Sequence, residues 1–231
     1  MALNTQVTAT KQTVAKSGTQ TTWTAARNAT SANSFINYTT PTDVSPSIRE
    51  RRISNSYLVD RTFLFFDLSG INGTITNMIL KIYGVSSNNI NVIPLKSTAF
   101  GDNRGVDFTA NDFNEWSPSS PTPYTTGNQA WVINQYNSFT LNSTAISDAN
   151  SGGYLNVVVL GNDYDYRDNP PTSNITTTAG TRFQNALNPL ELDITYNTTP
   201  PGWSGDINSV SVQDSINGVL NTSISSINNI S

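Results

Sequence analysis

The chain contains no cysteine and no histidine among its 231 residues. The absence of cysteine excludes a disulfide framework, a thiolate nucleophile and a cysteine-based metal site. The absence of histidine removes the commonest general base and the commonest metal ligand, and with them a serine triad of the usual type. We therefore expect neither an enzyme nor a resident organic cofactor.

Charged residues are also scarce, at 12% of the chain, and the formal net charge is −4. A weakly acidic chain lacks the basic surface with which proteins bind nucleic acid. No apolar run approaches the length of a transmembrane helix. The first residues, Met-Ala-Leu-Asn-Thr-Gln-Val, have neither the basic start nor the apolar segment of a secretory signal. We expect no nucleic-acid partner, no membrane association and synthesis without a signal peptide.

Small polar residues are abundant instead. The chain has 30 Asn, 31 Thr and 27 Ser, which together make 88 of its 231 residues. Threonine suits the exposed faces of strands, whereas asparagine and serine suit turns. This composition favours a β-rich surface or assembly protein over an enzyme.

The most informative segment is residues 57–83. Residues 63–68 read Phe-Leu-Phe-Phe-Asp-Leu, a run that is apolar on both faces and therefore predicts a strand buried between two layers. Gly70 and the pair Asn72-Gly73 predict a turn. Residues 76–83 then alternate apolar and polar side chains, which predicts a second strand with one exposed face.

The remaining chain continues the same organisation. Further strands are expected at residues 90–95, 138–141, 154–160 and 190–196, and residues 144–151 are interpreted as a single helical turn. Residues 100–128 form a long insertion, and loops of this length are either functional or cover part of the fold. Together these elements predict an all-β protein with a jelly-roll-like β-sandwich.

Three parts are expected along the chain. Residues 1–21 alternate only weakly and are interpreted as an extended N-terminal arm, with a first strand as the alternative. Residues 22–199 form the β-sandwich. Thr198-Thr199-Pro200-Pro201-Gly202 breaks regular structure and ends that domain, which leaves residues 200–231 as a C-terminal tail.

The tail repeats a short pattern, Ile-Asn-small-Val/Ile, three times, at spacings of 9 and 11 residues. Each unit has two apolar side chains, too few to form a core, so the units either dock on a partner or remain disordered. We expect docking, on other copies of the chain (for example in a trimer) or on another protein. The residues predicted to mediate this assembly are Ile207, Val210, Ile216, Val219, Ile227 and Ile230.

Residues 61–83 resemble a known family. Arg61-Thr-Phe-Leu-Phe-Phe-Asp-Leu-Ser69, followed by Thr74-Ile-Thr-Asn-Met-Ile-Leu-Lys-Ile-Tyr83, resembles the pattern of the DNRLRE-type β-sandwich, which is similar to a group of carbohydrate-binding modules. The resemblance covers about residues 22–197. It implies the fold, and it implies function only weakly.

The tail has a separate resemblance. Ser215-Ile-Asn-Gly-Val219 is similar to repeats that end many virion proteins of phages infecting Bacteroidota, including crAss-like phages. This resemblance implies a structural protein of the virion, either a capsid decoration or a head-fibre subunit, with other virion proteins as partners. A tail component and a glycan-binding module for adhesion to the host surface are the alternatives.

Five aromatic residues are candidates for stacking on sugar rings, because aromatic faces bind the polarised C–H groups of such rings. They are Trp116, Tyr124, Trp131, Tyr164 and Tyr166. Most aromatic side chains in a sandwich are core residues, so each of them has a structural role as its alternative.

Asp163, Asp165 and Asp168 alternate along one loop and are a weak calcium candidate, since calcium prefers several oxygen ligands. Arg167 within the same segment is expected to neutralise them if no metal binds. Asp112 and Glu115 are the nearest approach to the paired carboxylates of a glycoside hydrolase, a function that we rank last.

Overall fold

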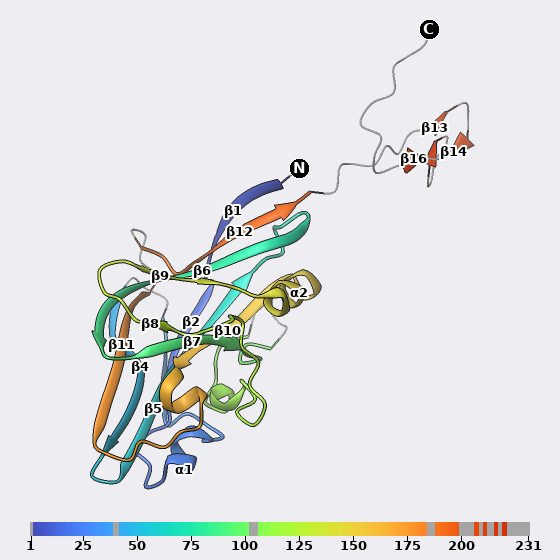
Figure 1. Ribbon diagram of the computed structural model, residues 1–231. Coiled ribbons are helices and arrows are strands. Elements are labelled where there is room, and N and C mark those ends of the chain that lie inside the picture. The colour runs from blue at the N-terminus through green and yellow to red at the C-terminus, as the bar shows by residue number, and fades with distance from the viewer. Residues whose placement is uncertain are drawn as a thin grey trace.

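The computed structural model describes residues 2–38, 42–101, 106–183 and 188–198, and four two-residue strands between 206 and 220. Twelve strands form one antiparallel network that folds into two layers (Figure 1). The prediction of an all-β sandwich is therefore confirmed.

The first layer contains the longest strand, β6, paired on one side with β12 and on the other with β9, and β12 is followed by the edge strand β1. Its strands are β1 (Ala2–Thr8), β6 (Thr74–Asn88), β9 (Tyr136–Thr140) and β12 (Glu191–Asn197).

The second layer is centred on β5, which pairs with β2 along one side and with β10 and β4 along the other. Its strands are β2 (Lys11–Lys16), β3 (Ser34–Asn37), β5 (Ser56–Asp67), β7 (Asn91–Lys96), β8 (Gln129–Ala130) and β10 (Tyr154–Gly161). Two further strands, β4 (Thr42–Ile53) and β11 (Ile175–Phe183), join the layers, because β4 pairs with β5 and β11 pairs with the second half of β6.

Four short helical segments interrupt the strands. They are α1 (Trp23–Arg27), the 3-10 helix η1 (Ala110–Asn114), α2 (Ser143–Gly152) and the π-helical turn η2 (Asn162–Tyr166). In α2 the side chain of Asn142 accepts a hydrogen bond from the backbone N–H of Ala145 (3.1 Å), which caps the helix. The strand expected at 138–141 overlaps β9, and the helical turn expected at 144–151 lies within the longer helix α2.

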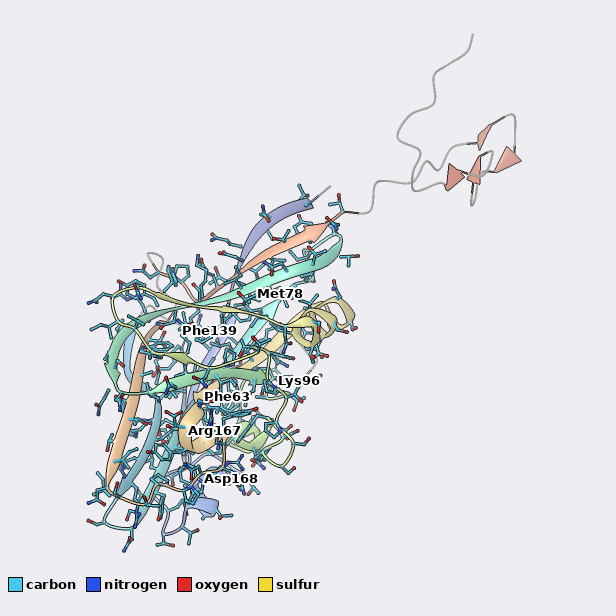
Figure 2. The ribbon with its side chains drawn as sticks, in the orientation of Figure 1. Phe63, Met78, Lys96, Phe139, Arg167 and Asp168 are labelled. Atoms are coloured by element: carbon cyan, nitrogen blue, oxygen red, sulfur yellow. The ribbon has the colours of Figure 1, made fainter. Side chains whose placement is uncertain are left out.

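Two hydrophobic clusters stabilise the fold, one on each face of β5. Leu64 and Phe66 point between the layers, where they join Met78 and Phe139. Phe63 and Phe65 point to the opposite face of β5 and lie in the second cluster. Figure 2 labels Phe63. The six-residue apolar run is therefore buried on both sides, as its sequence predicts.

The second cluster is covered by the long insertion. Phe100, Phe108, Phe113 and Trp116 come from this segment, and all are at most 2% exposed. Phe108 contacts the ring of Phe63 at 4.8 Å between centroids. The described part of the insertion thus serves to cover the outer face of the second layer, one of the two roles predicted for it.

The expected N-terminal arm is wrong. Strand β1 pairs with β12 along its whole length, from Ala2 opposite Asn197 to Thr8 opposite Glu191. Strand β2 pairs with the central strand β5, and Val14 and Ala15 are buried on its two faces. The alternative reading of a first strand is the correct one, since residues 2–16 belong to the sandwich.

In the tail, two of the repeat units form hairpins of their own. They are β13 (Asp206–Ile207) with β14 (Val210–Ser211), and β15 (Ser215–Ile216) with β16 (Val219–Leu220). Ile207 pairs with Val210 and Ile216 with Val219, all antiparallel. Ile227 and Ile230 lie outside the described residues, as do the side chains of the other four predicted assembly residues.

Candidate functional site

The loop after β10, where a calcium site was a candidate, contains a buried ion pair instead. Asp165 in η2 and Arg61 in β5 are both at most 1% exposed. Arg61 donates from Nε to Oδ2 and from Nη2 to Oδ1 of Asp165, both at 2.8 Å, which is a bidentate pair. The guanidinium lies 4.4 Å from the ring of Phe113 and 4.5 Å from that of Trp116.

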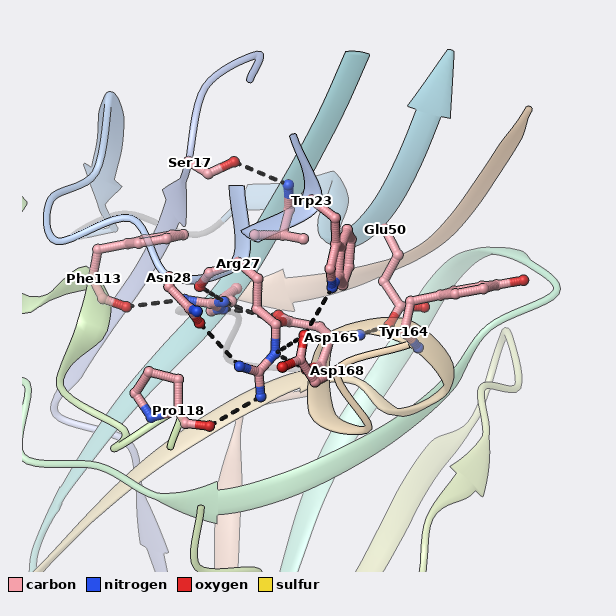
Figure 3. A network of polar contacts seen from close by, with 12 residues as sticks. Ser17, Trp23, Arg27, Asn28, Glu50, Phe113, Pro118, Tyr164, Asp165 and Asp168 are labelled. Atoms are coloured by element: carbon pink, nitrogen blue, oxygen red, sulfur yellow. Dashed lines mark hydrogen bonds and ion pairs between the residues drawn. The ribbon is translucent and has the colours of Figure 1, made fainter. Parts of the chain in front are cut away.

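A second arginine extends this network (Figure 3). Arg27 of α1 donates from Nε to the backbone oxygen of Asp165 (2.7 Å) and from Nη2 to that of Pro118 (3.1 Å). It also lies 3.5 Å from Asp168, whose carboxylate accepts a bond from Nε1 of Trp23 (3.1 Å). Burial lowers the pKa of Arg27, while the two aspartates oppose that shift. The network therefore joins α1, β5, η2 and the insertion.

Glu50 of β4 holds the other side of η2. Its Oε1 accepts hydrogen bonds from the backbone N–H of Tyr164 (3.0 Å) and of Asp165 (2.7 Å), and Thr177 contacts its Oε2 at 3.1 Å. Burial raises the pKa of Glu50 to about 7, against the opposing effect of these hydrogen bonds. A Cβ on Gly161 would lie 2.1 Å from Cδ of Glu50, so only glycine leaves room for this carboxyl group.

The three aspartates consequently do not fit a calcium ion. Asp165 is occupied by Arg61, Asp168 contacts Arg27 and Trp23, and Asp163 accepts from Nδ2 of Asn91 (2.8 Å). Across the described residues, no three acidic side chains are grouped as metal ligands. The candidate is therefore corrected: the neutralising cations are Arg61 and Arg27, rather than Arg167.

We accordingly predict that chelation leaves the thermal stability of the protein unchanged. Adding EDTA and then excess calcium should shift the melting temperature by less than about 1 °C in either step, because no carboxylate is freed for the ion. Differential scanning calorimetry measures this directly. A rise of several degrees on adding calcium would contradict the assignment of these aspartates to the arginine network.

Three of the five candidate sugar platforms are corrected by their burial. Trp116 and Tyr124 are 2% exposed and Trp131 is 6% exposed, so the faces of their rings are covered by core residues. Trp131 also donates from Nε1 to the backbone oxygen of Gly180 (3.2 Å), a structural contact. Tyr164 and Tyr166 are half-buried on η2 and pack against the second cluster.

The carboxylates of Asp112 and Glu115 are both used locally. Asp112 accepts from the backbone N–H of Thr109 (2.6 Å) as the cap of η1. Glu115 accepts from Oγ1 of Thr98 (2.5 Å). Nothing in these contacts arranges the two groups around a bond to be cleaved.

A groove lined by both polar and apolar groups lies where the end of β7, the start of β10 and α2 meet. Its volume is about 440 Å³, and it is lined by Lys96, Tyr124, Asp148, Tyr154 and Asn156, among others. Lys96 Nζ lies 2.8 Å from Oδ2 of Asp148, and the hydroxyl of Tyr124 donates to the same oxygen at 2.8 Å. Figure 2 shows Lys96 beside α2.

Sequence reasoning identified only Tyr124 among these groove residues, and for its ring rather than its hydroxyl. One available signal was Asn156, the single polar residue within the strand sequence Tyr-Leu-Asn-Val-Val-Val-Leu. A buried amide in an apolar strand requires partners, and such groups mark structural networks or sites.

Comparison with known proteins adds no relative: no protein-family model matches the chain, and no curated protein matches it. In the described part of the chain no helix is both long and apolar enough to cross a membrane. The fold and contacts define an all-β sandwich domain with a buried arginine–carboxylate network, a groove and a hairpin-forming tail.

Proposed function

We propose that the protein is a non-catalytic structural protein of a phage virion, a capsid decoration or head-fibre subunit, that is attached through its C-terminal repeats. The observation that carries the proposal is the folding of two repeat units into separate hairpins, neither of which pairs with the twelve-stranded sheet. The resemblance of Ser215–Val219 to repeats of phage virion proteins supports the same assignment.

The physical argument concerns the stability of such hairpins. Each has two residue pairs, such as Ile216 opposite Val219 and Ser215 opposite Leu220. A single two-stranded hairpin is marginally stable at best in water and needs further strands or an apolar surface. Binding to a second copy of the chain or to another virion protein supplies that surface, so the repeats are suited to assembly.

The arrangement of the termini is compatible with display. Asn197 at the end of β12 lies opposite Ala2 of β1, so the tail follows from the end of the domain where the chain begins. Helix α1 lies at the other end (Figure 1). Attachment through the tail would leave the end near α1 facing outward.

Deletion of the tail tests this proposal. We expect residues 1–198 to keep the melting temperature of the full chain, since in the described part of the tail β13 pairs with β14 and β15 with β16, outside the twelve-stranded sheet. We also expect the truncated chain to lose both oligomerisation and incorporation into particles. Light scattering after size exclusion and imaging of particles measure the two losses. The double variant Ile216→Asp with Val219→Asp should behave like the deletion, whereas Ser215→Ala should not. A truncated chain that still assembles and incorporates would overturn the attachment role.

A second candidate function, binding of surface glycans for host adhesion, is favoured by the groove. It is compatible with the first, because a displayed sandwich can carry a binding site. The groove supplies donors, acceptors and a partly exposed tyrosine ring, which together are typical of sites for hydroxyl-rich ligands.

For the first candidate function, imaging of labelled particles would also distinguish a position on the phage head from a position on the phage tail.

A further inference from the structure

Two buried polar atoms beside the groove have no hydrogen-bond partner. Asn156 is 5% exposed, and its Nδ2 donates to the backbone oxygen of Gly101 (2.8 Å), whereas its Oδ1 has none. Trp116 is 2% exposed, and its Nε1 also has none. An unsatisfied buried donor or acceptor costs free energy, so two in one region require an explanation.

Both atoms belong to residues that line connected surface features. Asn156 lines the groove of about 440 Å³, and Trp116 lines an adjoining hollow of about 50 Å³. The two share three lining residues, Lys96, Ser97 and Thr98. Asn156 and Trp116 therefore each line a hollow that borders the segment 96–98, and each has one buried polar atom without a partner.

The charged groups of the groove cancel one another. Lys96 and Asp148 form an ion pair at 2.8 Å, and their side chains are 43% and 31% exposed. Because the pair carries no net charge, it favours a neutral ligand that both donates and accepts hydrogen bonds over a phosphate or a cation. The volume of the groove lies within the range of small-molecule sites.

Tyr154 adds an apolar surface to the groove. Its ring is half-buried and stacks on Phe65, with centroids 5.7 Å apart and planes inclined at 16°. This packing fixes the orientation of the ring, so little conformational entropy is lost when a ligand contacts it. An apolar ring surface beside polar groups complements a molecule with hydroxyls around a C–H face.

We propose that this groove is a saccharide site, in which hydroxyl groups satisfy Oδ1 of Asn156 and pair with Lys96 and Asp148 while the sugar ring lies against Tyr154. A hydroxyl group both donates and accepts, so hydroxyls on one ring can match the unpaired acceptor of Asn156 and both members of the Lys96–Asp148 pair. The proposal rests on the second candidate function and assigns its site.

A screen of the full chain against immobilised neutral oligosaccharides, followed by calorimetric titration with the best one, tests the site. We expect Lys96→Met and Asn156→Leu each to weaken binding about tenfold or more, as for the loss of a hydrogen bond in a binding site. The matched control is Lys11→Met, which removes an equivalent lysine–aspartate pair with Asp107 elsewhere on the surface and should leave affinity unchanged.

The possible results distinguish failure of the groove as the binding site from failure of glycan binding as a function. Binding that survives unchanged in Lys96→Met, a variant at the exposed rim that does not depend on core packing, would overturn the groove as the site and leave glycan binding standing. Absence of binding to every saccharide would overturn both. Loss of binding in the two groove variants, with the Lys11→Met control intact, would establish the site.

Discussion

Replacing Asp165 by Asn should lower the free energy of unfolding by roughly 3–5 kcal/mol, because it leaves the buried guanidinium of Arg61 without its counter-charge. The variant side chain keeps nearly the same shape, so the loss reports charge rather than packing. A loss of this size is a large part of the roughly 5–15 kcal/mol by which domains are stable. We therefore expect the variant to unfold at a clearly lower temperature and urea concentration than the parent chain.

The contacts of Arg61 explain why the Asp165→Asn variant cannot regain this free energy by moving the guanidinium into solvent. Its Nη1 donates to the backbone oxygen of Phe113 (3.2 Å) and its Nη2 to that of Arg27 (2.6 Å), so the guanidinium cannot leave without breaking these bonds. Arginine also stays protonated in proteins, and Arg27 adds a second positive charge close by.

Urea denaturation of the purified full chain measures these differences. The matched control is Asp107→Asn, which removes an ion pair with Lys11 whose aspartate side chain is 80% exposed. We expect that control to change stability by less than about 0.5 kcal/mol, as is usual for surface pairs. If Asp165→Asn were as mild as this control, the network would not be a main contributor to stability.

The sequence predicts the fold well where local patterns decide it. The apolar run in β5 and the alternation in β6 follow from side-chain periodicity, and the predicted segments lie almost entirely within these two strands, which extend further than predicted. For β1 the sequence favours an arm over a strand, because its side chains alternate only between exposed and half-buried positions and it is held mainly by backbone pairing with β12. Backbone pairing leaves little trace in composition.

The site was less predictable, because its contacts join distant parts of the chain. Asp165 and its partner Arg61 are 104 residues apart, and Glu50 reaches η2 from a strand 115 residues away from Asp165. Spacing along one loop suggested a metal site, since alternate carboxylates are all that local sequence shows. Which cation compensates them is decided by the packing of α1, β4 and β5 against that loop.

The second large effect concerns pH, and it depends on the carboxyl group of Glu50. Its pKa rises from 4.5 to about 7 on folding because the group is buried. A raised pKa in an acid means that the folded state holds the proton more tightly than the unfolded state does. The contribution of Glu50 to stability is therefore fully present below about pH 4.5 and is lost as pH rises through about 7. Asp60, whose pKa burial raises to about 6, acts in the same direction over a lower range.

The neutral form of Glu50 fits its surroundings. Oε1 can accept both backbone N–H bonds as a carbonyl oxygen. The hydroxyl of Thr177 donates to Oε2 of the carboxylate, and on protonation it can donate to the backbone oxygen of Glu50 instead and accept from Oε2. A glutamine can make the same contacts, with its amide nitrogen as the donor. Glu50→Gln should therefore match the parent chain at pH 4.5 and exceed its stability by up to about 3 kcal/mol at pH 8, because burial raises the pKa of Glu50 from 4.5 to about 7.

Denaturation curves from pH 4 to 9 for the parent, Glu50→Gln and the exposed control Glu115→Gln measure this difference. The parent and the control should fall together as pH rises, while Glu50→Gln keeps only the dependence due to other groups, among them Asp60. The parent chain and Glu50→Gln differ in no titrating group other than residue 50, so the difference between their two curves is due to Glu50. The curve of Glu115→Gln shows how much the loss of an exposed glutamate changes the same measurement. A parent chain that is stabilised relative to Glu50→Gln above pH 7 would show that the two backbone N–H donors outweigh burial, and that Glu50 holds η2 as a carboxylate.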